Sequence, residues 1–100
     1  MPVERVRLRA KARRDIDGIW SYTAETWGPV AANDYVRGLQ ATLDVIGASP
    51  RIARERAAID PPVRVHPYHS HLVIYRIADD GIDVVRVFHS RRNWMAEMGS

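Results

Sequence analysis

The first segment of the chain alternates between apolar and charged positions. In the range Val3–Ala10, apolar side chains such as Val6 and Leu8 occupy every second position, and arginines fill the positions between them. A period of two is the pattern of a half-buried β-strand. We interpret the arginine row first as the charged outer face of a protected edge strand and second as a binding stripe.

The pattern then changes to the period of two α-helices. Apolar residues recur every three or four positions over Ala12–Trp27 and again over Pro29–Ala48. Gly28 and Pro29 separate the two helices, because glycine is favoured just past a helix end and proline in a first turn. Two long helices with almost no linker predict an antiparallel helical hairpin. The two apolar stripes are Ala12, Ile16, Ile19, Trp20, Thr23 and Trp27, then Ala32, Tyr35, Val36, Leu39, Leu43 and Ile46.

Aromatic side chains are part of both stripes. Trp20 and Trp27 belong to the first stripe and Tyr35 to the second. Large apolar side chains on the inner stripe of a helix are normally buried, so we expect all three in the core. The strand tyrosines Tyr68 and Tyr75 fit either a core or a surface position.

The segment that follows the helices has no clean period. Ser49 and Pro50 end the second helix, and the range Arg51–Pro62 mixes arginines, alanines and a proline pair. We expect an exposed loop here, with room for a helical turn over Ile52–Ala57. The tail Trp94–Ser100 is weakly patterned and allows a single helical turn.

The C-terminal half returns to a period of two and predicts three strands, Val63–Tyr68, His71–Ala78 and Ile82–His89. Asp79-Asp80-Gly81 lies between the second and third strands and has the residues of a tight hairpin turn. Pro67 marks an end or an edge of the first strand. The third strand is apolar on both faces, which indicates an interior position in the sheet.

The order strand, helix, helix, strand, strand, strand predicts an α+β fold. One face of the sheet should carry the helical hairpin. We expect the other face to be less covered, because no further helix of useful length remains. A length of 100 residues fits one domain, spanning residues 1–100.

The composition excludes several classes of protein. Hydrophobic residues make up 46% of the chain and are spread along it, which indicates a folded protein. There is no run of about 18 apolar residues that could span a membrane. The N-terminus lacks the apolar stretch of a secretory signal, and the absence of cysteine excludes disulfides and thiolate chemistry. We therefore expect a cytoplasmic protein without membrane association.

The basic residues are nearly all arginine. The net charge is +3, and Lys11 is the only lysine among 15 basic residues. A genome rich in G and C would explain this bias by itself. An acidic partner would also explain it, because the guanidinium group pairs with carboxylates and phosphates through two parallel hydrogen bonds.

The residues of common catalytic and metal sites are missing. His66, His69 and His71 form a cluster in the sequence, but no carboxylate or cysteine stands near them, and such histidines are more often hydrogen-bonded or exposed. There is no glycine-rich phosphate loop, no Gly-x-Ser-x-Gly motif and no carboxylate pair. We expect neither a metal nor a cofactor.

Arg86 is the most unusual of the basic residues on the strands. Strict alternation places it between Val84 and Phe88 on one face of an interior strand. A charge in such a place is costly unless it is paired or faces an open groove. Two hypotheses follow: a buried salt bridge, with Asp15 or Glu25 as the acid, or a concave basic face that receives an acidic partner.

The other basic strand residues extend this surface. The candidate partner-binding residues are Arg64, Arg76, Arg86, His89, Arg91 and Arg92. Arginines and a histidine without carboxylates could also support RNA cleavage through the 2′-hydroxyl, with arginine stabilising the transition state and histidine acting as acid or base.

The ordered set of motifs resembles a known family. The motifs cover the chain from about Val6 to Asn93, and their order and spacing resemble the ParE/RelE toxins of bacterial type II toxin–antitoxin systems. The resemblance is greater to the ParE branch, because lysines are missing from the sheet and no tyrosine follows the last strand. The residues that carry it are Ala12, Asp15, Ile16, Ile19, Trp20, Tyr22, Trp27-Gly28, Ala32, Tyr35, Leu39, Ser49-Pro50, Val63-Arg64, His71 to Arg76 and Val85 to Arg92.

The resemblance implies both a fold and a function. The fold is a helical hairpin against a mostly antiparallel sheet that ends in a three-stranded meander. The ParE branch implies a non-enzymatic toxin that inhibits DNA gyrase by binding, is neutralised in a hetero-oligomer by a cognate antitoxin and does not bind specific DNA sequences. The RelE branch implies the alternative, a ribosome-dependent mRNA endoribonuclease with Arg64, Arg86 and His89 as catalytic residues.

Overall fold

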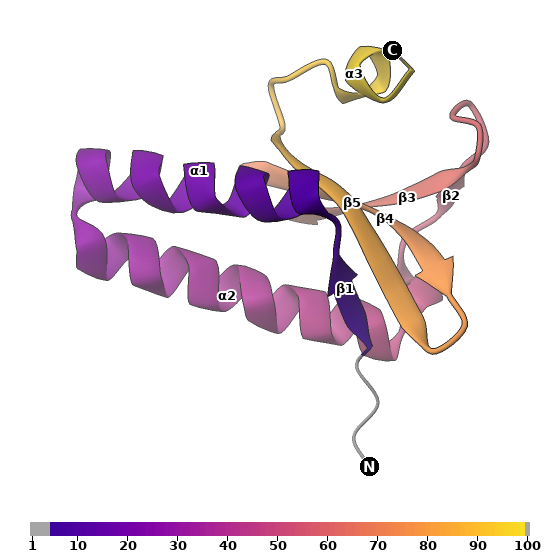
Figure 1. Cartoon of the computed structure of the whole chain (residues 1–100), viewed down its shortest axis with the longest axis horizontal. Helices are drawn as coiled ribbons and strands as arrows, with labels where there is room; N and C mark the ends of the chain where they lie inside the picture. Colours follow the sequence, from indigo (N-terminus) through magenta and orange to yellow (C-terminus); the bar gives the residue numbers. More distant parts are fainter. Residues whose placement is uncertain (1–4, 100) are drawn as a thin grey trace.

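The computed structural model describes residues 5–99 and has the predicted α+β order (Figure 1). A hairpin of two helices packs on a sheet of five strands. The start of the first predicted strand, residues 3 and 4, lies outside the described residues, as does Ser100. The elements are β1 (Val6–Leu8), α1 (Ala10–Trp27), α2 (Pro29–Ala48), the 3₁₀ turn η1 (Pro50–Ile52), β2 (Glu55–Arg56), β3 (Val63–Tyr68), β4 (His71–Ala78), β5 (Gly81–His89) and α3 (Trp94–Gly99).

The sheet has the strand order β1-β5-β4-β3-β2. Strands β3, β4 and β5 form the antiparallel meander implied by the resemblance, and β1 pairs in parallel with β5. β5 is therefore an interior strand and β1 an edge strand, as the sequence predicts. On that edge, Arg7 pairs with Asp80 at 2.8 Å, which agrees with a charged and protected outer face.

The chain changes from β1 to α1 at Arg9. The Arg9 N–H donates to the Val84 carbonyl at 3.0 Å, and the Arg9 carbonyl accepts from Arg13 N–H at 3.0 Å. Pairing with β5 thus ends where helical pairing begins. β1 ends at Leu8 and helix α1 begins at Ala10, so the predicted strand, which runs to Ala10, is wrong at Arg9 and Ala10.

Gly28 forms the turn between the two helices. Its φ angle of 95° lies in the left-handed region that favours glycine, and its N–H caps α1 by donating to the Ala24 carbonyl at 2.9 Å. Pro29 then occupies the first turn of α2, where a missing N–H costs nothing. The Gly28–Pro29 prediction is confirmed.

The main core lies between the helical hairpin and the sheet. It contains Tyr75, which is fully buried and donates its hydroxyl hydrogen to the Pro50 carbonyl at 2.6 Å. The strand tyrosine left open by the sequence is thus a core residue with a satisfied polar group. The buried members of this core are Ala12, Ile19, Leu39, Leu43, Ile46, Ala53, Val73, Tyr75, Ile82, Val84 and Val87.

Two of the three helix aromatics are not in the core. Trp20 is 37% exposed and Trp27 is 75% exposed, so the prediction of burial is wrong for both. The hairpin extends past the sheet at the end where α1 meets α2, so the inner stripe of α1 has no strand beneath it there (Figure 1). Tyr35 of α2 does pack against the main core.

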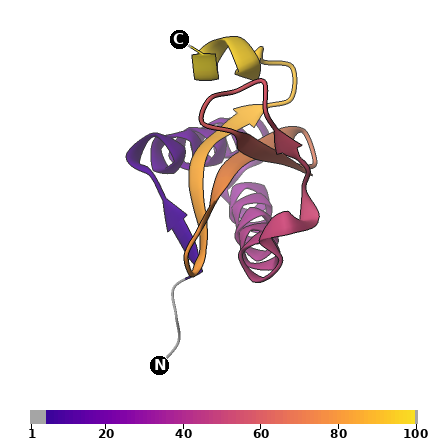
Figure 2. The ribbon, with the colours of Figure 1, turned by 90° about the vertical axis from the view of Figure 1, so that its right-hand side faces the viewer.

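The opposite face of the sheet carries a second, smaller core. Ile74 and Phe88 are 0% and 1% exposed there, and Trp94 and Met98 of α3 pack against them. Helix α3 lies on the far side of the strands from α2 (Figure 2). The prediction that this face is poorly covered is wrong at its centre, because one short helix is enough to cover two large side chains.

The segment between α2 and β3 differs in detail from the predicted loop. A 3₁₀ turn lies at Pro50–Ile52, ahead of the expected turn over Ile52–Ala57. Glu55 and Arg56 then pair with β3 as a two-residue strand that the sequence did not predict. A strand this short gives no periodic signal, so only the partner strand reveals it.

The second core should contribute to stability. We expect Phe88→Ala to lower the free energy of unfolding by about 3 to 5 kcal/mol, because it removes a large buried ring and leaves a cavity. Denaturant unfolding would measure the loss. The control is Ile52→Ala at a side chain that is 54% exposed, which should change stability by less than about 0.5 kcal/mol. Equal effects of the two substitutions would show that Phe88 is not buried in the second core.

Candidate partner-binding groove

A β-bulge in β5 determines which residues face the groove. Tyr75 pairs with Val84 while the preceding Ile74 pairs with Arg86, so Val85 is an extra residue. One extra residue reverses the alternation of side chains beyond it. Val84 therefore belongs to the main core and Phe88 to the second core, and the prediction that Arg86 lies between them on one face is wrong.

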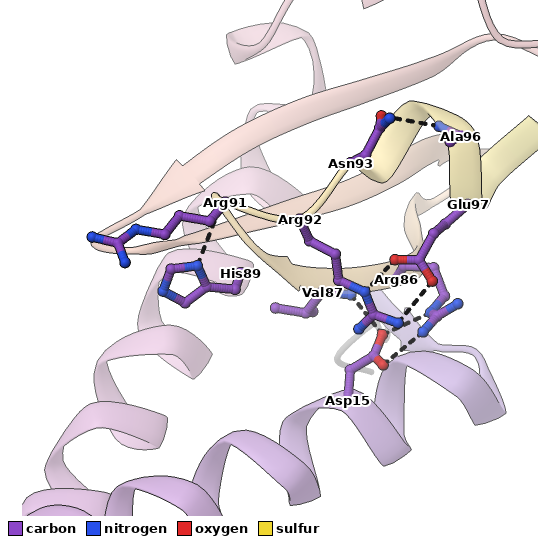
Figure 3. A network of polar contacts seen from close by, with 9 residues as sticks. All are labelled: Asp15, Arg86, Val87, His89, Arg91, Arg92, Asn93, Ala96 and Glu97. Carbon is purple, nitrogen blue, oxygen red and sulfur yellow. Dashed lines mark hydrogen bonds and ion pairs between the residues drawn. The ribbon is translucent and has the colours of Figure 1, made fainter.

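Arg86 is paired with Asp15, the first of the two acids that the sequence offered (Figure 3). Its Nε donates to Asp15 Oδ2 at 2.8 Å and a terminal nitrogen donates to Oδ1 at 2.9 Å. The Val87 N–H also donates to Oδ2, at 2.9 Å. The hydrogen bond with Asp15 is the main reason why the pKa of Arg86 is raised above its ordinary value.

This carboxylate joins a helix to a strand. Asp15 lies on α1, and its three donors lie on β5 just after the bulge. The two charged side chains are only 18% and 12% exposed. Arg86 also lies over the Phe88 ring, with its guanidinium carbon 4.3 Å from the ring centroid. Arg86 therefore has a structural role, and the hypothesis of an open basic face at this residue is wrong.

Arg64 and Arg76 lie away from Arg86. Arg64 donates to the Ala53 carbonyl at 2.6 Å and lies 3.9 Å from a Glu55 carboxylate oxygen. Arg76 donates to the Pro61 carbonyl at 3.1 Å. Burial, and secondarily the nearby charge of Arg9, lowers the pKa of Arg76. Both arginines support the loop that precedes β3.

His89, Arg91 and Arg92 lie at the end of β5 and in the turn after it, and the Arg92 side chain points away from the other two, toward Glu97 (Figure 3). The Arg91 N–H donates to His89 Nδ1 at 3.1 Å, which orients the exposed imidazole. Arg92 pairs with Glu97 of α3 and lies 4.8 Å from the centroid of the Phe88 ring. Of the six predicted partner-binding residues, these three have exposed positions.

A groove of about 500 Å³ lies beside this cluster. It runs between α1 and the ends of β4 and β5. The lining residues come from α1, from Tyr35 of α2, and from the two strands and the loops next to them. They are Arg14, Asp15, Gly18, Ile19, Tyr22, Thr23, Trp27, Tyr35, Ser70, His71, Val87, His89 and Arg92.

The groove has one basic end and one aromatic end. Arg14, near the start of α1, and Arg92 line the basic end and are exposed, while the exposed His89 lies beside His71 and Tyr35, away from Arg14. Tyr22 and Trp27 line the aromatic end and are 69% and 75% exposed. Such a groove can accept a segment that carries both carboxylates and large apolar side chains.

Histidine and tyrosine side chains form a network of hydrogen bonds and ring contacts on the side of the groove that is formed by the sheet. His71 Nδ1 and the Tyr35 hydroxyl are hydrogen-bonded at 2.7 Å, and the rings of His71 and His89 are 5.3 Å apart. Tyr68 in turn donates to the Tyr35 carbonyl at 2.7 Å. Gly38 makes this approach possible, because a β-carbon there would collide with the Tyr68 hydroxyl. The network ties α2 to β3 and β4.

The three clustered histidines have different partners. His66 is hydrogen-bonded to the Pro67 carbonyl at 2.7 Å, and the ring of His69 lies 4.6 Å from that of Tyr68. His71 contacts Tyr35 as described. Within residues 5–99, no three histidine, aspartate or glutamate side chains come together as metal ligands would.

The three residues proposed for RNA cleavage, Arg64, Arg86 and His89, do not lie together in one site. Arg64 and His89 pair with Tyr75 and His71 of β4, four positions apart, which is about 13 Å along the strand. Arg86 is occupied by Asp15. The structure therefore brings only His89, of these three, to the groove.

Several groove residues are not distinguished by the sequence. Arg14 is one of many arginines, and the helical period predicts a core position for Trp27. Tyr22 entered only as part of the family pattern. The sequence gives only a weak indication of a binding role for these residues. That role becomes recognisable only when the end of the hairpin is known to extend past the sheet.

Comparison with known proteins identifies the family. Residues 6–94 match the family model described as ParE toxin of type II toxin–antitoxin system, parDE. The chain is 34% identical over 93 residues to Toxin ParE1 of Caulobacter vibrioides, covering 93% of this chain and 96% of that protein. It is 40% identical over 88 residues to Toxin ParE1 of Mycobacterium tuberculosis, covering 87% and 90%. The chain belongs to the ParE toxin family of type II toxin–antitoxin systems.

The fold agrees with this assignment. A structure described as the chromosomal ParDE TA system from P. aeruginosa aligns with a TM-score of 0.72 and 19% identity, covering 84% of this chain and 92% of the other. The family model and the two relatives confirm the ParE resemblance of the sequence. Among residues 5–99, no helix combines the length and the apolar character needed to cross a membrane.

The Asp15–Arg86 pair should be strongly coupled. We expect Arg86→Ala and Asp15→Ala each to lower the free energy of unfolding by about 3 kcal/mol, because each leaves a mostly buried charge without its partner. The double variant should lose less than the sum of the two, by more than about 1 kcal/mol. The control is Arg7→Ala, whose ion pair is half exposed and should contribute less than about 1 kcal/mol. Additive losses at Asp15 and Arg86 would contradict the coupling.

His71 should make stability depend on pH. Burial, and secondarily His89, lowers the pKa of His71 below its ordinary value of 6.5. The unfolded chain then binds this proton more readily, so stability is complete above about pH 6.5 and falls as the pH drops below it. Melting temperatures from pH 8 to pH 5 should fall less in His71→Gln than in the wild type. Parallel curves for the two proteins would refute this contribution.

Proposed function

We propose that this ParE-family protein is a cytoplasmic toxin that arrests growth by binding DNA gyrase, and that a cognate antitoxin neutralises it in a hetero-oligomeric complex. The family match over residues 6–94 supports a toxin of a parDE system. The observation that favours binding over catalysis is that two candidate arginines on the sheet are already hydrogen-bonded within the protein. Arg86 is held by Asp15 and Arg64 by the Ala53 carbonyl, so neither guanidinium is available to a phosphate.

The groove is the proposed site for the antitoxin. Arg14 and Arg92 present guanidinium groups at one end, and Tyr22 and Trp27 present apolar surface at the other, with His89 also in the lining. An extended antitoxin segment with acidic and large apolar side chains would satisfy both ends. Charge complementarity would speed its association with this basic protein. Arg91 adds charge beside the groove, while Arg64, Arg76 and Arg86 act by supporting the sheet.

A supercoiling assay tests the proposed target. Excess purified toxin should inhibit supercoiling of relaxed plasmid by gyrase, because inhibition by binding needs only a stoichiometric complex. The product of the reading frame next to the toxin gene should restore supercoiling when it is added first. Cellular transcripts should stay intact during growth arrest. Unimpaired supercoiling, or messenger RNA cut on the ribosome, would contradict the proposal.

Charge reversal at Arg14 tests whether the groove binds the antitoxin, with the affinity of toxin for antitoxin as the measured quantity. Arg14→Glu should reduce affinity for the antitoxin by about tenfold, because it puts a like charge against an acidic segment. Arg13→Glu is the matched control, since Arg13 is exposed on the same helix but does not line the groove. Equal antitoxin affinities of the two variants would place the antitoxin elsewhere.

A further inference from the structure

The end of the helical hairpin carries a surface that differs from the rest of the molecule. Tyr22, Trp27 and Val30 are 69%, 75% and 73% exposed there, around the Gly28 turn. Large exposed apolar side chains that gather at one place mark a binding surface more often than chance. We name this surface, together with the exposed acids Glu25 and Asp34, the hairpin tip.

The hairpin tip is acidic, although the protein is basic. Residues 15–36 contain four acidic residues and no arginine, lysine or histidine, so all 15 basic residues lie outside this stretch. Asp15 is occupied by Arg86, and Asp34 lies 3.8 Å from Arg37 in an ion pair exposed to solvent, while Asp17 and Glu25 are exposed. The molecule therefore presents acidic charge around its most exposed tryptophan and basic charge around the opposite end of the groove.

From this charge separation we infer that the hairpin tip binds the toxin's target, through a basic protein surface that contains an apolar pocket. The inference rests on the proposed function, in which the target is gyrase. An enzyme that holds DNA presents basic surfaces to the phosphates, and an acidic tip is complementary to them. DNA itself would be repelled by the acidic side chains of the tip.

Trp27 and Tyr22 are the expected anchors of this contact. Tryptophan and tyrosine dominate the energy of protein interfaces when they enter a pocket and lose water. Glu25 and Asp34 lie on the exposed sides of α1 and α2, where surrounding charges mainly steer association and select the partner. The aromatic anchors of the tip, surrounded by acidic side chains, therefore fit an apolar pocket on the target that is surrounded by basic side chains.

The position of the tip also explains how an antitoxin would neutralise the toxin. Tyr22 and Trp27 belong both to the hairpin tip and to the aromatic end of the groove. A segment that fills the groove covers these two side chains. Target and antitoxin would then compete for the same aromatic residues, while Glu25 and Asp34 would serve the target alone because they do not line the groove.

Charge reversal at the tip tests the inference without altering the groove. Glu25→Lys/Asp34→Lys should weaken growth arrest and lower gyrase affinity at least tenfold, while antitoxin affinity stays within twofold of the wild type. Asp44→Lys/Asp79→Lys is the matched control, with the same change in charge at two exposed acids away from the tip. Trp27→Ala should lower affinity for both gyrase and the antitoxin. Circular dichroism and melting temperature would show that each variant is folded.

The possible results distinguish failure of the inference about the tip from failure of the proposed function. If the wild type arrests growth and the tip variant arrests it equally, the inference about the tip is wrong. If the wild type arrests growth without inhibiting gyrase, the proposed target is wrong, and loss of arrest in the tip variant still supports the tip as the surface for another basic target. If analytical ultracentrifugation shows self-association that the tip variant abolishes, the tip binds a second copy of this chain and the inference is overturned.

Discussion

The carboxylate of Asp15 accepts three hydrogen bonds from β5, two from the Arg86 side chain and one from the Val87 N–H. This contact fixes the height and the angle of α1 over the sheet, because a fork-shaped guanidinium allows little freedom of orientation. It also satisfies backbone and side-chain groups beside the bulge at Val85, where the ladder of β4 and β5 is interrupted. Asp15 lines the groove, and Arg86 lies over the Phe88 ring, on which α3 also packs through Trp94 and Met98.

The extension of the hairpin past the sheet is the second constraint. It leaves the inner stripe of α1 without a strand beneath it and exposes Trp27 beside Tyr22. A helical hairpin can be extended in this way because its two helices pack on each other, with Ala32 fully buried and Trp20 donating to Asn33 at 2.9 Å. The exposed stripe is then available to partners instead of the core.

Two surfaces follow from these constraints and share two aromatic side chains. In the proposed function, an acidic segment would occupy the basic end of the groove and a basic protein surface would contact the acidic tip. A segment that fills the groove would then block the target contact without unfolding the toxin, because both contacts use Tyr22 and Trp27. Arg86 and Arg64 contribute to the fold, through Asp15 and the Ala53 carbonyl.

The sequence by itself determined the order of the helices and of every strand except β2, because periods of two and of three to four residues are local properties. It also determined the turn at Gly28 and the family, because both follow from the identity and spacing of neighbouring residues. Tertiary structure decided the rest. The bulge at Val85 reversed the face of Phe88, Arg86 received Asp15 from 71 positions away, and Trp27 became exposed because burial depends on what lies opposite a side chain, which no local pattern records.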